Sequence, residues 1–226
     1  MDWNRLARKK RFWLGGILAA LVCGMGLSWY LHAGPSVLVV HAIESWKDRT
    51  DLKRILGHRE RLLRFAAEAK VDPYLLAGIM WAESRGVSGQ TSSAGALGLM
   101  QLSRPAASDA ARRLGLPEPT QDDLLHNDDL NVRLAAHHVR WLLDVRGDWT
   151  LEMVLVSYNA GRTKLKRWIE EAGGYPEWCA SEEQAKREGR KTTGALAYAR
   201  RTLQVAETLR STSALDPGQA GESAQR

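Results

Sequence analysis

The sequence predicts an all-α, mainly helical protein with one N-terminal transmembrane helix. Between about residues 59 and 210, apolar residues recur at the i, i+3, i+4 and i+7 spacing of helices with one buried face. The same region has no convincing run of the strict alternation that is typical of a strand. Residues 12–31 form a run of 20 uncharged residues, long enough to span ~30 Å of bilayer as a helix. A chain of 226 residues has room for one domain with a substantial core and short appendages.

The charges around the apolar run predict its orientation. Residues 1–11 hold five basic residues against Asp2, so most of the net charge of +6 lies there. Because positive flanks stay inside, residues 1–11 are expected to be a cytoplasmic basic segment, residues 12–31 an anchor, and residues from about 35 onward extracytoplasmic. The small remaining charge gives no reason to expect a nucleic acid partner. A cleaved signal peptide is the alternative, although the run exceeds the roughly 7 to 15 residues of a signal core.

A linker and two helices are expected next. Residues 32–58 follow the anchor, turn strongly polar and are predicted to form a stalk with some helix. A first helix from about 59 to 70 is indicated by one apolar face, made by Leu62, Phe65, Ala66 and Ala69. The second helix runs from Pro73 to Ser84, because Asp72 is a strong N-cap and proline is favoured at the first helical position.

Four more helices complete the predicted domain. The third covers residues 105–114 and the fourth covers about 130–145, with an inner face of Leu134, His138, Trp141, Leu142 and Val145. Thr150 caps the fifth, whose inner face is Leu151, Val154, Leu155 and Tyr158. The sixth covers residues 195–209, and the polar segment 173–194 carries no prediction. One helical domain is thus expected at 59–210, followed by a disordered tail at 211–226, which has almost no apolar residues.

Glu83 is the first candidate for chemistry. It follows Leu76, Ile79 and Met80 at helical spacing, so its carboxyl points the same way as the apolar stripe. Apolar surroundings raise the pKa of a carboxyl because its charged form is poorly solvated, and with a pKa of about 6 roughly a tenth stays protonated at pH 7. Such a group is suited to protonate a glycosidic oxygen. The alternative is a carboxylate that turns to water at the helix end or pairs with Arg85.

Two other features accompany this carboxyl. Tyr158 continues the inner face of the fifth helix, which puts a phenol on the buried side. Residues 90–101 carry Gly95, Gly98 and two serines, which is typical of a loop whose backbone approaches another group closely. Taken alone, an ordinary glycine-rich turn explains the loop equally well.

Three short segments together resemble a known family. They are Glu83-Ser84, then Gly-Ala-Leu-Gly-Leu-Met-Gln at residues 95–101, then Ser-Tyr-Asn-Ala-Gly at residues 157–161. In order and spacing they are similar to the three motifs of the soluble-lytic-transglycosylase-like family, which is related to goose-type lysozyme. The similarity covers about residues 60–210.

The resemblance implies a lysozyme-like fold with a glycan cleft between its lobes. It also implies that the partner is bacterial peptidoglycan and that no cofactor is needed. Glu83 would be the sole catalytic residue, first protonating the oxygen between N-acetylmuramic acid and N-acetylglucosamine. It would then act as base on the muramoyl 6-hydroxyl, which closes a 1,6-anhydro ring without consuming water. With the anchor, this places the enzyme on the periplasmic side of a bacterial inner membrane.

The resemblance also implies roles for residues around the acid. The residues expected to contact the glycan or support the reaction are Ser84, Met100, Gln101, Tyr158 and Asn159. Of these, Tyr158 is expected to orient the carboxyl of Glu83. The family's last helix usually begins with a Glu-Thr pair a few residues before a tyrosine, which here is Tyr198, and Gly194 stands in place of that glutamate. We expect altered substrate contacts there, with activity retained.

Two other functions fit the same motifs. A hydrolytic muramidase would use water in place of the 6-hydroxyl, and an inactive scaffold would bind peptidoglycan without cutting it. No metal site is expected, because no Cys, Asp or Glu spacing completes one with the available histidines, His126, His137 and His138. Trp141 and Trp149 are expected in the core, whereas Trp168 and Trp178 are candidates for contact with a glycan. Protein partners and oligomeric state are not predicted.

Overall fold

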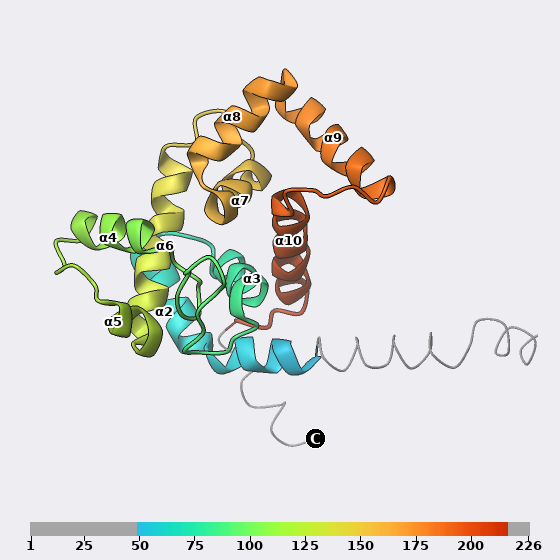
Figure 1. The fold of residues 1–226 in the computed structure, drawn as a ribbon. Coiled ribbons are helices and arrows are strands. Elements are labelled where there is room, and N and C mark those ends of the chain that lie inside the picture. The colour runs from blue at the N-terminus through green and yellow to red at the C-terminus, as the bar shows by residue number, and fades with distance from the viewer. Residues whose placement is uncertain (1–48, 217–226) are drawn as a thin grey trace, which may run out of the picture. The chain divides into compact units, whose positions relative to one another are not determined.

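The computed structural model describes residues 49–216, and those from Asp51 onward belong to one compact unit (Figure 1). The predicted anchor at 12–31 and its flank at 1–11 lie outside the described residues. Within residues 49–216, no helix is both long and apolar enough to cross a membrane.

The described residues are mainly helical, which confirms the all-α class. After helical residues 51–57, the helices are α2 (Arg59–Ala69), α3 (Pro73–Ser84), α4 (Arg104–Arg113), α5 (Gln121–His126), α6 (Asp128–Asp144), α7 (Leu151–Ala160), α8 (Arg162–Ala172), α9 (Tyr175–Arg187) and α10 (Ala195–Ser211). This part of the chain contains no β-strand. Its β-type backbone pairing is limited to two isolated bridges in the loop before α4.

Helix α3 lies at the centre of the core and is buried on nearly all sides. Leu76, Ile79 and Met80 have no exposed surface. The Asp72 side chain accepts a hydrogen bond from the Tyr74 backbone N–H at 3.0 Å, as the N-cap prediction requires. A helix that is apolar all round needs partners on every face, and α2 and α10 both pack against it.

Helices α3 and α10 run antiparallel and approach closely at Gly78. A β-carbon at Gly78 would lie 2.6 Å from the Thr202 carbonyl oxygen and 3.2 Å from the Ala206 side chain. Only glycine therefore fits here. The two helices run in opposite directions, so moving forward along α3 from Gly78 corresponds to moving backward along α10 from Thr202. Glu83, about one and a half turns after Gly78, therefore lies opposite Tyr198, which is about one turn before Thr202.

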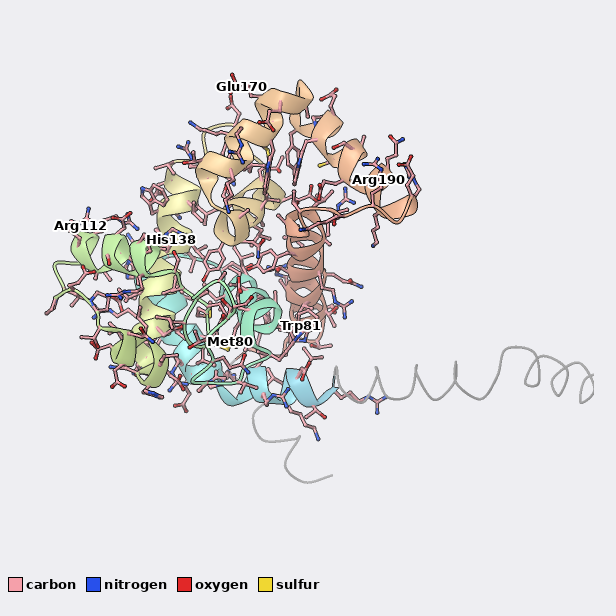
Figure 2. All side chains as sticks on the ribbon, in the orientation of Figure 1. Met80, Trp81, Arg112, His138, Glu170 and Arg190 are labelled. Carbon is pink, nitrogen blue, oxygen red and sulfur yellow. The ribbon has the colours of Figure 1, made fainter. Side chains whose placement is uncertain are left out.

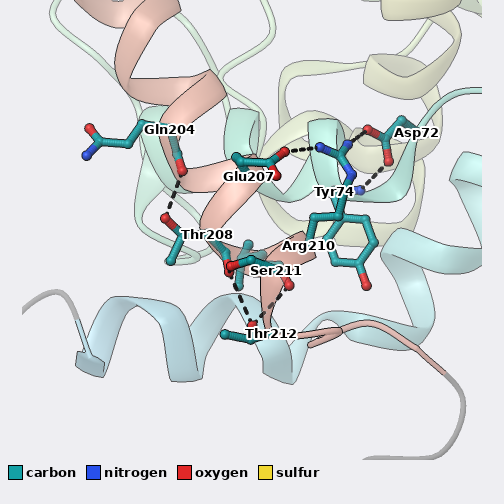
Figure 3. Close-up of polar contacts among 9 residues, drawn as sticks. Asp72, Tyr74, Gln204, Glu207, Thr208, Arg210, Ser211 and Thr212 are labelled. Atoms are coloured by element: carbon teal, nitrogen blue, oxygen red, sulfur yellow. Dashed lines mark hydrogen bonds and ion pairs between the residues drawn. The ribbon is translucent and has the colours of Figure 1, made fainter.

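The far end of the α3–α10 pair is held by polar contacts. Arg210 on α10 pairs with Asp72 at the start of α3 and, at 2.6 Å, with Glu207 on its own helix (Figure 3). The Tyr74 hydroxyl donates to Asp216 at 2.7 Å. These contacts fix the register of the two helices that carry Glu83 and Tyr198.

The boundaries of the domain differ from the prediction at both ends. Residues 51–57, assigned to the stalk, are helical and bring Ile55 into the core with no exposed surface. Leu215, assigned to the disordered tail, is 1% exposed. Leu215 is a lone apolar side chain of a polar segment, which shows no periodicity and yet fills a place in the core. At the other end, Leu52, Ile55 and Leu56 have the i, i+3, i+4 spacing of a helix, which the predicted boundary at residue 59 left out.

Helices α5, α8 and α9 were not predicted. Helix α5 has only six residues and is held by a capping box between Thr120 and Asp123. In α8 only Leu165 is buried, and in α9 only Trp178 and Ala185 are. So few buried positions leave no stripe to detect in a polar sequence.

The inner face of α6 also differs from the prediction. Leu134 and Leu142 are buried as expected, whereas His138, Trp141 and Val145 are only partly buried. The buried stripe instead includes Asn131, Val132, Ala135 and Val139. The small residues of this helix let α2 and α4 pack closely against it, and the larger aromatic rings lie at the edge of that contact.

Candidate active site

Glu83 lies in the last turn of α3, following the buried stripe that predicted its direction. Its side chain is partly buried, between the fully buried Met80 and solvent. Burial raises the pKa of Glu83 to about 7, and a hydrogen bond from Tyr198 acts in the opposite direction. Roughly half of the molecules therefore carry a proton on Glu83 at pH 7. The direction of this pKa shift is the one expected from the sequence, and the shift is larger than expected.

Tyr198 is the residue that orients the Glu83 carboxyl. Its hydroxyl donates to Glu83 Oε1 at 2.7 Å. Burial, followed by the charge of Glu83, raises the pKa of Tyr198, so the phenol keeps its proton and remains a donor. Helical phase could have placed Tyr198 on the inner face of α10, because it shares the face of Ala195, Thr202 and Val205, which are all buried.

Tyr158 was expected to orient the carboxyl, and this expectation is wrong. Its hydroxyl donates instead to the Met100 backbone carbonyl at 2.8 Å. The phenol is nevertheless near the acid, because burial and then the charge of Glu83 raise its pKa. Tyr158 therefore ties α7 to the glycine-rich loop beside Glu83.

The glycine-rich loop is held by Asn131, a buried residue of α6 with no exposed surface. The Asn131 side-chain oxygen accepts from the Met100 backbone N–H, and its amide donates to the carbonyls of Leu97 and Leu124, all at 2.9 Å. One side chain thus bonds to three backbone groups, two in the loop and one in α5, and the Leu97 carbonyl also accepts from the Leu102 backbone N–H at 3.1 Å. The sequence prediction placed Asn131 on a helix but missed this role.

Gly98 is required by the same contact. Its φ is +75°, and an added β-carbon would lie 2.2 Å from the Leu124 carbonyl oxygen and 2.5 Å from Asn131 Nδ2. Glycine is the residue that tolerates both the left-handed backbone and the close approach. The loop prediction, that backbone comes close to another group here, is confirmed, and the group is Asn131.

The other predicted site residues lie around this loop in different surroundings. Gln101 is partly buried, and its amide donates to the Gly98 carbonyl at 2.9 Å. Ser84 is 3% exposed, and its hydroxyl accepts from the Gly86 backbone N–H at 3.2 Å, so it closes the end of α3. Asn159 is exposed. Met100 has no exposed side-chain surface, and its backbone holds Tyr158 and Asn131.

The turn before α10 explains how the chain accommodates Gly194. Gly194 is exposed and precedes α10 with a φ of +77°. The neighbouring Thr193 donates both its backbone N–H, at 3.0 Å, and its hydroxyl, at 2.7 Å, to Glu182 of α9. A glutamate therefore holds this turn from another helix.

Two tryptophans considered as glycan contacts lie against each other. The rings of Trp168 and Trp178 stack with centroids 5.5 Å apart, and Trp178 is 4% exposed. Trp178 is thus part of the core that joins α8 to α9 and offers no surface to a ligand.

Taken together, the site holds one neutral or anionic carboxyl between two protonated phenols. A group with a pKa near 7 is equally ready to give and to accept a proton, which suits one residue to act first as acid and then as base. The pKa of Glu83 is set by burial, which raises it, and by the hydrogen bond from Tyr198, which lowers it.

Comparison with known proteins gives three similarities. A model of the family described as Transglycosylase SLT domain matches residues 63–180. A transglycosylase of Enterobacteria phage PRD1 is 33% identical over 111 residues, which are 49% of this chain and 37% of the phage protein. An inactive mutant of the lytic transglycosylase Slt from Pseudomonas aeruginosa has a similar structure, with a TM-score of 0.57 and 23% identity over 70% of this chain. That similarity indicates the fold.

Both relatives are longer than the region they share with this chain. The match covers 25% of Slt and 37% of the phage transglycosylase. Residues 63–180, which the family model matches, include the helices that carry Glu83, Asn131 and Tyr158.

Proposed function

Because the chain belongs to the Transglycosylase SLT domain family, whose model matches residues 63–180 of its 226, we propose that it is a peptidoglycan lytic transglycosylase. The observation that carries the proposal is Glu83, a partly buried carboxyl with a pKa of about 7 held by Tyr198. The substrate is the glycan strand of peptidoglycan, cut between N-acetylmuramic acid and N-acetylglucosamine. The names of the phage and Pseudomonas relatives support this substrate class.

The reaction needs only one carboxyl that changes protonation state twice. Protonated Glu83 gives its proton to the glycosidic oxygen, and the bond from the muramoyl C1 to that oxygen breaks with oxocarbenium character at C1. The Glu83 carboxylate, held by the Tyr198 hydroxyl, then takes the proton of the muramoyl 6-hydroxyl. The 6-oxygen bonds to C1 and closes the 1,6-anhydro ring. Glu83 ends protonated, as it began, and no water enters the balance.

Ser84, Met100, Gln101, Tyr158 and Asn159 are proposed to lie around the bound glycan or to support it. Of these, Gln101 and Asn159 have exposed or partly exposed side chains that are able to touch a sugar directly. Met100 and Ser84 are buried and are proposed to act through the backbone that they hold.

The test is product analysis on purified sacculi by mass spectrometry. Wild-type protein is expected to release muropeptides with anhydro ends, which are lighter by one water than reducing ends, and Glu83→Gln is expected to release none. Glu68→Gln is the control, because that carboxylate bonds to Arg133 and His137. Reducing ends in place of anhydro ends would mean a hydrolytic muramidase, and equal release by wild type and Glu83→Gln would end the enzyme proposal.

We further propose that residues 12–31 anchor the protein in the bacterial inner membrane with the catalytic domain on the periplasmic side. The support is the uncharged 20-residue run and the basic residues before it. Protease added to spheroplasts is expected to digest the chain from about residue 35 onward. Protection of that region would refute the orientation.

A further inference from the structure

A row of aromatic and basic side chains leads away from Glu83 across α7, α6 and α4. Next to Glu83 is Tyr158, whose ring centroid lies 5.7 Å from that of His138. Trp141 stacks on His138 with centroids 5.6 Å apart, and the Arg113 guanidinium lies 4.9 Å from the Trp141 centroid. Figure 2 shows His138 on α6, next to α4. We call Arg113, His138 and Trp141 the α4–α6 row.

Two polar groups of the α4–α6 row have hydrogen-bonding capacity that no residue among 49–216 takes up. His138 Nδ1 is fully enclosed and has no hydrogen-bond partner, although the side chain as a whole is partly exposed. Arg113 is exposed and makes no hydrogen bond or ion pair within residues 49–216. By contrast, the neighbouring His137 bonds to Glu68 at 3.2 Å.

The state of His138 follows from its surroundings. Burial, and then the charge of Arg113, lower the pKa of His138 to about 4, against a weaker opposite effect of Asp109. The ring is therefore neutral at pH 7. A buried N–H without a partner is costlier than a buried lone pair, so the proton resides on Nε2, and the ring offers one donor at its other edge.

These groups match the chemistry of an acidic amino sugar. A neutral ring N–H suits a hydroxyl or acetamido oxygen, and a guanidinium with unused donors suits a carboxylate. The glycan strand of peptidoglycan alternates two N-acetylated sugars, and the lactyl group of the muramoyl sugar bears a short peptide with free carboxylates. Tyr158 connects the row to the surroundings of Glu83, because its ring contacts His138 and the charge of Glu83 raises its pKa.

We propose that the α4–α6 row is a subsite for a sugar of the same strand, remote from the bond that is cut. His138 Nε2–H donates to a hydroxyl or acetamido oxygen, and Arg113 binds a carboxylate of the muramoyl substituent. Trp141 holds both side chains in position. The inference rests on the proposed function, because that function supplies the strand.

The first test measures strand binding in a Glu83→Gln background, where no turnover occurs. His138→Phe keeps the aromatic ring but removes both nitrogens, and it is expected to weaken binding of long strands by ~3- to 10-fold. A single disaccharide unit, too short to reach the row, is expected to bind equally well. The control is His137→Phe, which alters the adjacent residue that contacts Glu68.

The second test uses Arg113→Gln. Because Arg113 is exposed, this substitution is expected to leave the fold intact, so weaker strand binding would report the lost guanidinium. It is expected to weaken binding of muramoyl-containing strands by ~10-fold or more, while chitooligosaccharides of equal length, which lack the carboxylate, bind as before. His138→Phe is expected to weaken both ligands. Arg112→Gln is the control, because Arg112 pairs with Asp109 at 2.6 Å.

The outcomes separate this inference from the proposed activity. If both row variants bind long strands as tightly as their controls, the row is not a subsite. If wild type binds strands with the expected dependence on length, His138 and Arg113 but releases no anhydro ends from sacculi, the proposed activity is wrong and the subsite stands.

Discussion

The raised pKa of Glu83 should make the protein less stable at high pH, and Glu83→Gln should remove this penalty. Burial raises the pKa from its ordinary value of 4.5 to about 7. Below pH 4.5 the carboxyl is protonated in both folded and unfolded chains and costs nothing. As the pH rises through 7, the unfolded chain ionises more readily than the folded one, so stability is lost.

The size of the effect follows from the difference between the two pKa values. Each pKa unit corresponds to ~1.4 kcal/mol, so the loss above pH 7 is about 3 kcal/mol. Glutamine has the same shape, remains neutral and still accepts from the Tyr198 hydroxyl. At pH 4 the free energy of unfolding of Glu83→Gln is therefore expected to equal that of wild type. At pH 8 it is expected to exceed that of wild type by about 3 kcal/mol.

The measurement is urea unfolding of the full chain at both pH values, followed by tryptophan fluorescence. Glu68→Gln provides a control of opposite sign. Burial tends to raise the pKa of Glu68, but hydrogen bonds from Arg133 and His137 outweigh it and the pKa is lowered. Compared with wild type, Glu68→Gln should therefore have a lower free energy of unfolding at pH 8, and the difference should be smaller at pH 4. If Glu83→Gln gains nothing between pH 4 and pH 8, the carboxyl is well solvated and the proposed acid is wrong.

Three other predictions concern the site and its supporting loop. Tyr198→Phe removes a hydrogen bond that stabilises the Glu83 carboxylate, so the basic limb of the profile of kcat/KM against pH should move up by about one pH unit. Tyr158→Phe should leave this limb in place, and equal shifts for the two variants would contradict the assignment. Gly98→Ala should cost about 3 kcal/mol or more in the free energy of unfolding, whereas Gly95→Ala, with nothing within 4 Å of the new methyl, should cost about 1 kcal/mol from its backbone alone. Asn131→Ala should cost about 3 kcal/mol, measured by the same urea unfolding, and a loss below ~1 kcal/mol would mean that water replaces the amide.

The most reliable sequence predictions were those with local causes. Helix α3 begins and ends where Asp72, Pro73 and Ser84 indicated, because caps and proline act through neighbouring backbone. The inward direction of Glu83 followed from the period of the helix, since Leu76 and Met80 mark the buried side. The length of α8 and α9 could not be predicted, because their polar sequences bury so few side chains.

The partners of the site residues could not be predicted in the same way. Tyr158 and Tyr198 both lie on buried helix faces, and periodicity cannot say which of them reaches the acid. That choice depends on the antiparallel register of α3 and α10, which Gly78 permits by letting the two backbones meet. Tyr158 lies instead against the carbonyl of Met100, at 2.8 Å.

The sequence by itself determined the helical class, the bounds of α3 and the inward direction of the Glu83 carboxyl, since each depends on residues within a few turns of one another. Tertiary structure alone decided that Tyr198 holds Glu83, that Asn131 holds the loop, and that Ile55 and Leu215 belong to the core. Those contacts join residues far apart in the chain, and their geometry depends on how whole helices pack, which no local spacing specifies.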